Sequence, residues 1–407
     1  MIDGFHRGAL IDGEIGMDTG VGMRPGNGDN GSNGNGNGDG NNHLLDIVIL
    51  GLSITSSWSN GQATTYRGLV RELCARGHRV LFLEYDQARH AENRDLPKPP
   101  FGHTVLYSSV KELKDRFTSA IRNADLVIVG SCVREGKLIG DWVTRIAHGV
   151  TAFYDIDTPV TMARLRGGEF DYLSADLIER YQMYLSFTGG PLLDFIEKRY
   201  GSPMARPLYC SVDPELYFPE QRQIQWDIGY MGTYSEDRQP ALDELMLEAA
   251  RRCPRCAFVV AGTEYPRDIQ WPKNIKRLAH LTQAKHRAFY NSQKFTLNVT
   301  RADMVETGYS PTLRLFEAAA CGTPIITDFW EGLEEFFEPN EEILVSRSCE
   351  ETLAWLRGLD EEQRKRVGSD ARQRVLRHHT ARHRAIELED YAFELLKPNP
   401  SRKAVLA

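Results

Sequence analysis

The sequence lacks the features that mark several common protein classes. Its longest apolar run, around residues 47–52, is far too short to cross a membrane. It contains no Gly-x-x-x-x-Gly-Lys-Ser/Thr loop and no Ser-His-Asp arrangement, which leaves P-loop enzymes and serine hydrolases poorly supported. No Gly-x-Gly-x-x-Gly motif follows the apolar runs at 46–51 and 226–231, so a dinucleotide oxidoreductase is also disfavoured.

The chain has no excess of positive charge and few cysteines. The 407 residues carry a net charge of −7, so nothing suggests a nucleic-acid partner. The seven cysteines are scattered and odd in number, which favours reduced core thiols in a cytoplasmic protein. Cys253 and Cys256 have CxxC spacing, but no second Cys or His pair lies at zinc-finger distance. We therefore assign these two residues neither a metal nor a redox role.

Residues 1–43 differ in composition from the rest of the chain. The tract 26–42 consists only of Gly, Asn, Asp and Ser. Because such a segment cannot offset its ordering entropy by burial, we expect a disordered tail. It has no apolar core of the kind found in signal peptides, so a flexible tail is favoured over an export signal.

From residue 44 onward, apolar strands alternate with helices in two successive series. The first series of predicted strands is 46–51, 79–84, 126–130, 150–154, 183–188 and 205–209. The second series is 226–231, 257–261, 275–280, 294–298, 324–327 and 343–345. Alternation of this kind predicts an α/β protein with doubly wound parallel sheets, whose ligands bind beyond the carboxyl ends of the strands.

The two prolines in 211–219 mark a break between the series. We predict a domain over 44–213, a linker over 214–225, and a second domain over 226–380. The remainder, 381–407, is predicted as a C-terminal helix and tail, for which packing back on the N-terminal domain is one arrangement. The whole segment 361–396 is predicted to be helical and basic on all sides, so a solvated face is favoured over contact with anionic lipid.

The segment 309–328 is the most informative part of the chain. It predicts a loop, a short helix over 311–320 and a buried strand. Arg314 and Glu317 are three residues apart and share one helical face. Arg314 suits a diphosphate, as does the helix N-terminus, and Glu317 can accept hydrogen bonds from ribose hydroxyls. The alternative is a surface Arg–Glu pair on an ordinary helix.

Three further regions are candidates for the same ligand. Gly232, Thr233 and Arg238 follow the strand 226–231, where a glycine, a hydroxyl and a cation suit a phosphate. His280 ends a predicted strand and so lies at the cleft, although a lone histidine is more often structural. The first strand–helix loop ends with Asn60, Gly61 and Gln62, which fit a phosphate-approach loop or a plain turn equally well.

Asp155 and Asp157 follow a strand of the first series and leave three interpretations open. They can form a metal-binding DxD pair, or supply a general base or acceptor-binding carboxylate. Alternatively, Asp157 or Thr158 only caps a helix that starts at Pro159.

Several of these motifs together resemble the spore-maturation-protein (CgeB-like) branch of the group 1 glycosyltransferases. The similar stretches are Arg-Leu-Phe-Glu-Ala-Ala-Ala-Cys-Gly at 314–322, the loop 232–238, Asp-Ile-Asp-Thr-Pro at 155–159, Phe-Thr-Gly-Gly at 187–190 and Leu-Tyr-Cys-Ser-Val-Asp-Pro at 208–214. The resemblance spans 46–396 and implies a GT-B fold. In that fold two Rossmann-like domains face a cleft, and the C-terminal domain holds most of a nucleotide-sugar donor.

The resemblance assigns roles within the segment 309–317. Glu317 matches the ribose-binding glutamate that ends the group's E-x7-E motif, and Arg314 with the amides around Pro311 and Thr312 matches the diphosphate contacts. Tyr309 stands where the group has the first glutamate of the motif. Because that glutamate contacts the sugar in the wider group, the departure leaves the identity of the sugar open.

The resemblance also implies a reaction. A sugar moves from a nucleoside diphosphate to an unidentified acceptor, with Gly232, Thr233 and Arg238 facing the pyrophosphate. Asp155 and Asp157 are the catalytic candidates if an acceptor hydroxyl needs a base. We predict no metal and no cofactor beyond the nucleotide sugar itself. A nucleotide-sugar epimerase and a non-catalytic nucleotide-sugar-binding protein remain alternatives.

Overall fold

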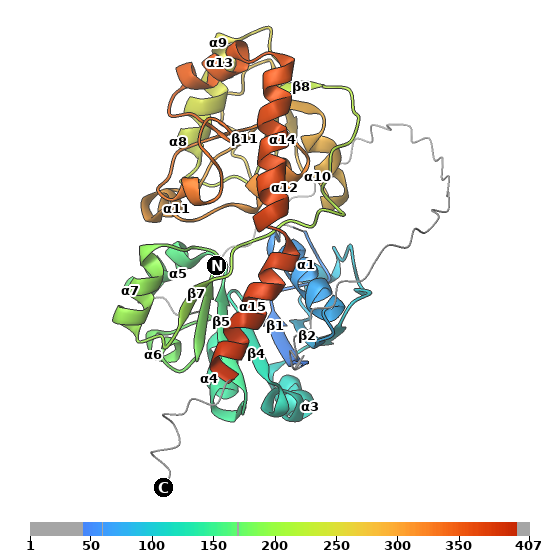
Figure 1. Ribbon diagram of the computed structural model, residues 1–407, viewed down its shortest axis with the longest axis vertical. Helices are drawn as coiled ribbons and strands as arrows, with labels where there is room; N and C mark the ends of the chain where they lie inside the picture. The colour runs from blue at the N-terminus through green and yellow to red at the C-terminus, as the bar shows by residue number, and fades with distance from the viewer. Residues whose placement is uncertain (1–43, 59, 169–170, 397–407) are drawn as a thin grey trace, which may run out of the picture. The chain divides into compact units, whose positions relative to one another are not determined.

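The computed structural model describes residues 44–58, 60–168 and 171–396, and the predicted N-terminal tail lies outside these ranges. The first domain has a seven-stranded sheet of order β3-β2-β1-β4-β5-β6-β7 (Figure 1). Its strands are β1 Asp46–Gly51, β2 Arg79–Tyr85, β3 His103–Tyr107, β4 Leu126–Gly130, β5 Val150–Asp155, β6 Met183–Ser186 and β7 Ala205–Pro207. Its helices are α1 Gln62–Ala75, α2 Ala88–Ala91, α3 Val110–Asn123, α4 Gly136–Ile146, α5 Thr158–Arg166, α6 Ala175–Ile178 and α7 Pro191–Tyr200.

The second domain has a six-stranded sheet of order β10-β9-β8-β11-β12-β13. Its strands are β8 Trp226–Met231, β9 Phe258–Ala261, β10 Ile275–Leu278, β11 Gln293–Asn298, β12 Ile325–Thr327 and β13 Leu344–Val345. Its helices are α8 Gln239–Leu242, η1 Asp243–Leu247, α9 Glu248–Arg252, α10 Gln283–Tyr290, α11 Ala302–Thr307, α12 Leu313–Ala320, η2 Leu333–Glu335, α13 Cys349–Gly358 and α14 Glu361–His378, and α15 Ala381–Leu396 follows.

The doubly wound architecture is confirmed. Every strand pair in both sheets is parallel, β1 pairs with both β2 and β4, and β8 pairs with both β9 and β11. The order of strands therefore reverses at β1 and at β8, and ligand sites of such sheets form at these switch points. Strand β3 was not predicted, and the single helix predicted over 361–396 is two helices separated at His379 and Thr380.

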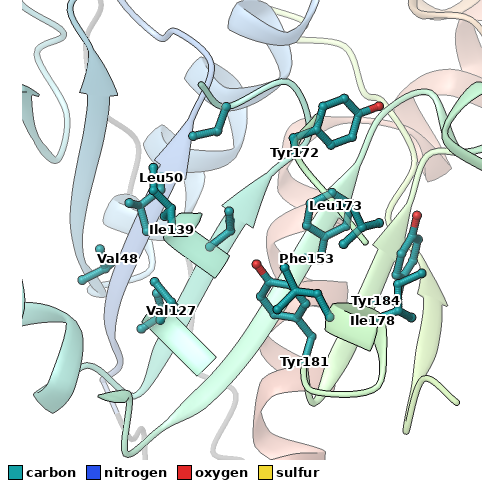
Figure 2. Packing of buried hydrophobic residues seen from close by; sticks show 14 of the residues in the cluster. Val48, Leu50, Val127, Ile139, Phe153, Tyr172, Leu173, Ile178, Tyr181 and Tyr184 are labelled. Atoms are coloured by element: carbon teal, nitrogen blue, oxygen red, sulfur yellow. The ribbon is translucent and has the colours of Figure 1, made fainter. Parts of the chain in front are cut away.

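Apolar side chains cover both faces of the first sheet, as expected for buried parallel strands. Figure 2 shows one face, where Val48 and Val127 lie near Ile139 of α4 and Phe153 lies beside Tyr181. On the other face, the strands pack against α1 and α15. Helix α15 contributes Ala385, Leu388 and Ala392 to this part of the core. The last helix of the chain therefore completes the core of the first domain.

The chain crosses between the domains twice, and the two crossings touch. Val212 lies on the first crossing and forms a parallel bridge with Thr380 on the second. The Val212 amide donates to His379 O, and the Ala381 amide donates to Val212 O, both at 3.1 Å. The break between α14 and α15 thus occurs where the backbone pairs with another segment, which explains why one long helix does not form.

Two findings concern general properties of the chain. Within the described ranges, no helix is both long and apolar enough to cross a membrane.

The prediction that all cysteines are reduced is wrong for Cys253 and Cys256, which form a disulfide. The Cys256 amide donates to Cys253 O at 3.0 Å, and this tight turn brings the two side chains together.

Candidate functional site

A cavity of about 460 Å³ lies where the loops after the switch-point strands of both domains meet. Eight residues singled out from the sequence line it: Asn60, Gly61, Gly232, Thr233, Arg238, His280, Arg314 and Glu317. Sequence analysis missed other polar lining residues, among them Ser57, Trp58, Asp95, Thr263, Gln283 and His286. The cavity thus combines most of the predicted donor residues of the second domain with a wall from the first.

Arg314 is held rigidly at one wall of this cavity. Its Nη1 donates to Met231 O at 2.8 Å and its Nη2 donates to Val299 O at 3.1 Å, while the guanidinium lies 5.6 Å from the ring centroid of Tyr230. Although burial lowers the pKa of Arg314, Tyr230 raises it, and the net shift is upward. No carboxylate in the described part of the chain forms an ion pair with this cation. The surface Arg–Glu pair considered from the sequence is therefore not what the structure contains.

Arg238 is a second, less satisfied cation in the same cavity. Its Nη2 donates to Thr233 O at 3.3 Å, but its Nε is buried without a hydrogen-bond partner. Burial, followed by repulsion from Arg314, lowers the pKa of Arg238. Two guanidinium groups that repel each other across a cavity form a strong site for a dianion.

Close packing requires a glycine at position 232, in the loop after β8. A Cβ at Gly232 would lie 2.6 Å from the Tyr230 hydroxyl and 2.9 Å from Nη1 of Arg314. A Cβ at Gly262, where φ is +157°, would lie 1.9 Å from Gly232 O. The backbone of the loop after β8 therefore lies against Arg314, and neither Gly232 nor Gly262 leaves room for a side chain.

Glu317 is 2% exposed and lies one turn along α12 from Arg314. The Tyr290 hydroxyl donates to its Oε2 at 3.1 Å, and Nδ1 of His286 lies 3.7 Å from the same oxygen. Burial lowers the pKa of His286, but Glu317 raises it, and the net shift is upward. The carboxylate is thus fixed in one orientation at the cavity wall, and one helix presents both a cation and an anion to the ligand.

Three predicted donor residues in the segment before α12 do not line the cavity. The Thr312 hydroxyl donates to Oδ1 of Asn298 at 2.8 Å, Pro311 O lies 3.5 Å from Sγ of Cys210, and Tyr309 O accepts from the Gly189 amide at 3.0 Å. The Thr312 hydroxyl thus makes a structural hydrogen bond, and the diphosphate contact of the amides around Pro311 and Thr312 stays a prediction.

Tyr309 has a strained backbone at the contact between the domains. Its φ of 51° is in the left-handed region. Its ring lies so close to Gly190 and Gly332 that a Cβ at either position would be 2.3–2.4 Å from it. The position that matches the first glutamate of E-x7-E thus supports the interface between the domains in this chain.

Asp155 does not line the cavity, although the Asp157 amide donates to its Oδ1 at 3.3 Å. Asp155 is 0% exposed; the Tyr184 hydroxyl donates to its Oδ2 at 2.6 Å and the Thr161 hydroxyl donates to its Oδ1 at 3.0 Å. Burial raises its pKa to about 6. The catalytic contact predicted for Asp155 is therefore not formed, because its oxygens are committed to buried hydroxyl groups.

Asp157 is half-buried and precedes α5. Its side chain does not cap α5, so the capping interpretation fails for this residue. Burial raises its pKa, whereas Arg301, Arg238 and Arg164 lower it, and the net shift is upward. Arg238 lines the cavity, so one of the three cations that lower the pKa of Asp157 belongs to the candidate site, although Asp157 is not a lining residue.

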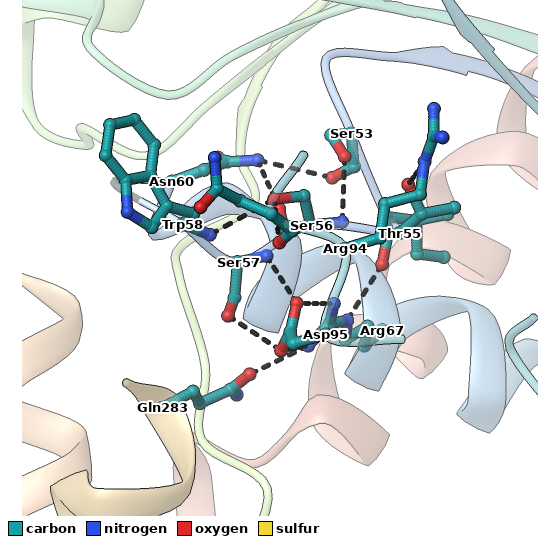
Figure 3. Close-up of polar contacts among 12 residues, drawn as sticks. Ser53, Thr55, Ser56, Ser57, Trp58, Asn60, Arg67, Arg94, Asp95 and Gln283 are labelled. Atoms are coloured by element: carbon teal, nitrogen blue, oxygen red, sulfur yellow. Dashed lines mark hydrogen bonds and ion pairs between the residues drawn. The ribbon is translucent and has the colours of Figure 1, made fainter. Parts of the chain in front are cut away.

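The first-domain wall of the cavity includes Ser57, Trp58, Asn60 and Gly61 from the loop before α1, of which only Asn60 and Gly61 were predicted. Two carboxylates hold this loop. Glu84 at the end of β2 accepts hydrogen bonds from the amides of Ile54 and Thr55 and from two hydroxyls. Asp95 accepts from the amide and the hydroxyl of Ser57 at 2.8 Å each (Figure 3). Residues 53–57 of this loop are therefore held by hydrogen bonds to carboxylates of the first domain.

Within this loop the three predicted residues have different roles. Oδ1 of Asn60 accepts from the Gln62 amide at 3.1 Å, and Nδ2 of Asn60 donates to Ser56 O at 3.2 Å, so Asn60 forms the turn. Gly61 precedes α1 and is exposed at the cavity. Gln62 is buried and does not line the cavity, which corrects its predicted contact with phosphate. His280 lies beyond the end of β10, with its ring centroid 6.3 Å from that of Trp58.

Residues 238–390 match the family described as Glycosyl transferase-like, and no curated protein matches the sequence. The structure is similar to sucrose-phosphate synthase from Thermosynechococcus elongatus, with a TM-score of 0.62, 14% identity, and coverage of 87% of this chain and 99% of that chain. HepE from Anabaena, in complex with UDP and glucose, has a TM-score of 0.66 at 12% identity over 86% of this chain and 100% of that chain. An alpha-glucosyltransferase in complex with UDP-glucose and DNA has a TM-score of 0.64 at 12% identity over 85% and 98%. The chain therefore has the GT-B fold that the resemblance implied.

Proposed function

We propose that this protein is a glycosyltransferase that moves a hexose-type sugar from a nucleoside diphosphate to an acceptor hydroxyl. The observation that carries the proposal is the convergence of Arg238, Arg314 and Glu317 on one cavity. The match of residues 238–390 to a Glycosyl transferase-like family supports it, because that segment supplies all three residues. Membership of the CgeB-like branch of group 1 is part of the proposal and rests on the sequence motifs.

The two guanidinium groups would stabilise the departing diphosphate. Charge develops on the leaving group as the glycosidic bond breaks, and fixed cations stabilise that charge most when they need no rearrangement. Arg314 is fixed by Met231 and Val299, and Arg238 has a free Nε donor. The N-terminus of α12 adds the positive end of a helix dipole. We propose that these groups, and not a metal ion, neutralise the diphosphate.

Glu317 would bind the nucleoside through its ribose. A carboxylate accepts from two neighbouring hydroxyls, and Glu317 is oriented for this by Tyr290 and His286. HepE and the alpha-glucosyltransferase were solved with UDP or UDP-glucose, so UDP-glucose is the first donor to test on this chain.

Asp157 is our candidate for contact with the acceptor. A reaction that inverts the anomeric centre needs a base for the acceptor hydroxyl, and an upward-shifted carboxyl pKa strengthens a carboxylate as a base. A reaction that retains configuration needs only an orienting group, which the same carboxylate provides. Asp155 would support this part of the first domain without touching the acceptor.

The decisive experiment is calorimetric titration with UDP, GDP, dTDP and their common sugar conjugates. We expect micromolar binding of one nucleotide class by the wild type, and at least a tenfold loss in Glu317→Gln, since hydrogen bonds to a charged group contribute about 1.5–3 kcal/mol. Glu362→Gln on the exposed surface of α14 is the matched control. Absence of binding by every nucleotide would overturn the proposal. A converted sugar still attached to its nucleotide, formed without acceptor, would identify an epimerase instead.

A further inference from the structure

A bridge of two hydrogen bonds joins the domains at the edge of the cavity. Gln283 is the first residue of α10, and both ends of its amide contact α1. Nη1 of Arg67 donates to Oε1 of Gln283 at 2.8 Å, and Nε2 of Gln283 donates to the Thr64 hydroxyl at 3.0 Å. Because a guanidinium can only donate, the amide oxygen must face Arg67, which fixes the orientation of the amide.

On the side of the first domain, the bridge rests on a rigid support. The side chain of Arg67 is 9% exposed; its Nε donates to Ile54 O at 2.8 Å and its two Nη atoms donate to Asp95 at 2.9 Å each. Asp95 also holds the amide and hydroxyl of Ser57. Figure 3 shows Gln283 reaching this network from the other domain. The loop 53–61 and the bridge therefore belong to one set of hydrogen bonds.

This network stays charged over a wide pH range. Burial raises the pKa of Asp95, but hydrogen bonds from Arg67 and Ser57 outweigh that effect and lower the pKa to about 2. The Asp95 carboxyl group is thus ionised at neutral pH, and Gln283 accepts from an Arg67 that is already paired with this carboxylate.

On the side of the second domain, the same helix reaches the ligand site. His286 lies one turn after Gln283 in α10, and residues three apart share a helical face. Nδ1 of His286 is 3.7 Å from Oε2 of Glu317. Helix α10 therefore contacts the carboxylate that would bind ribose at one position and the first domain at another.

We propose that Gln283 is a positioning residue that latches α1, and through Arg67 the loop residues 53–58, at the edge of the donor cavity, and that α10 couples this latch to ligand binding at Glu317. The second half of the proposal rests on the proposed function. A ligand that binds Glu317 and restricts the motion of His286 would also hold α10 in place, and with it the contacts of Gln283 with Arg67 and Thr64. The closed edge would then exclude water, which otherwise hydrolyses an activated sugar.

The test is hydrogen–deuterium exchange of the full-length protein, with and without UDP. Gln283→Met keeps the length of the side chain and removes both hydrogen bonds, and Thr64→Val removes only the second. Lys285→Met, on the exposed face of α10, is the matched control. Without nucleotide, we expect exchange of the loop 53–61 to rise roughly tenfold in Gln283→Met and less in Thr64→Val. Gln283→Glu should restore protection, because its carboxylate can still accept from Arg67.

Each outcome separates the latch from the proposed function. Equal loop exchange in wild type, Gln283→Met and Lys285→Met would overturn the latch. If UDP protects the loop in wild type but only α12 and α10 in Gln283→Met, both halves of the proposal hold. If Gln283→Met loosens the loop but UDP changes exchange nowhere, the latch stands and the coupling fails together with the nucleotide site. In a donor-hydrolysis assay, Gln283→Met should raise KM for UDP-glucose more than it lowers kcat, whereas a misfolded variant would lose activity without such a split.

Discussion

Two aspartates only two residues apart have different chemistry because one of them is enclosed. Asp155 ends β5 inside the first domain, where hydroxyls of Tyr184 and Thr161 donate to it. Asp157 lies half-buried among arginines of both domains. A DxD pattern suggests that the two carboxylates act together, whereas the structure encloses Asp155 and leaves Asp157 half-buried near arginines of both domains.

The enclosure of Asp155 predicts a pH-dependent effect on stability. Burial raises its pKa from 3.8 to about 6, so the folded state binds a proton more tightly than the unfolded state between these values. The stabilisation is complete below pH about 4 and is lost as pH rises through about 6. Asp155→Asn removes this loss, so its free energy of unfolding relative to wild type should increase by about 3 kcal/mol between pH 4 and pH 7. Urea unfolding at both pH values measures the difference.

The control for this prediction is Asp194→Asn, whose side chain is 71% exposed. This variant removes a carboxyl group at the surface and leaves the buried Asp155 in place. A constant difference for Asp155→Asn across the same pH interval would show that Asp155 does not carry the effect.

Arg238 predicts a conflict between stability and binding. Its buried Nε lacks a partner and Arg314 repels it, so a neutral side chain of similar length should suit the empty cavity better. We expect Arg238→Met to raise the melting temperature by a few degrees and to lower nucleotide affinity at least tenfold. Thermal melts with and without UDP measure both effects. Exposed Arg199→Met is the control, and a lower melting temperature for Arg238→Met would contradict the prediction.

At the scale of elements, the orientation of Glu317 and Arg314 depends on how α14 supports α12. A Cβ at Gly368 of α14 would lie 2.1 Å from Gly322 O, just after α12. Nε of Arg372 donates to Ala320 O at 3.2 Å, near the same helix end. The two helices are therefore in direct backbone contact, which fixes α12 behind the cavity.

Gly368→Ala should destabilise the protein although alanine is the better helix former. The added methyl group must push α14 away from α12, at a cost of about 1–3 kcal/mol or more, which exceeds the gain of roughly 1 kcal/mol in helix propensity. Gly358→Ala at the end of α13 is the matched control, because nothing lies within 4 Å of its Cβ. Denaturant melts should show a loss for the first variant and no loss for the second. Equal stability of the two variants would mean that the contact is loose.

The sequence predicted elements well where local patterns decide them. Strands β1, β4 and β8 have the predicted bounds, because each is a compact apolar run between clear breaks. Strand β3 was missed because it is a sheet-edge segment with mostly half-buried side chains. The break near His379 was missed because it depends on pairing with Val212, far away in the sequence.

The cavity residues divide in the same way into those that a local sequence motif predicts and those that depend on contacts between distant segments. Arg314, Glu317 and Arg238 were predicted because each belongs to a local motif with a chemical meaning. Asp95 and Gln283 were not, because their positions depend on contacts between segments distant in the chain. No spacing or composition in the sequence marks such residues, so the first-domain wall of the cavity needed the structure.

At the scale of the whole molecule, the last helix belongs to the first domain although it follows the second. Helix α15 packs against α1 (Figure 1), and Ala381 lies so close to Gly68 that a Cβ there would be 2.8 Å from it. Nε2 of His78 lies 2.5 Å from Oε1 of Glu389, and Arg76 forms an ion pair with the same carboxylate. The first domain is therefore incomplete until the chain has passed through the second.

A chain that ends after residue 380 should lose the first domain and keep the second. The truncation removes Ala385, Leu388 and Ala392 from the core on one face of the first sheet, and it leaves His78 without its buried partner. These losses exceed the few kcal/mol by which a domain is stable, whereas no core residue of the second domain is removed. Hydrogen exchange should show protection in β8 to β13 and rapid exchange in β1 to β7. Persistent protection in β1 and β4 would show instead that the first sheet is stable without its last helix.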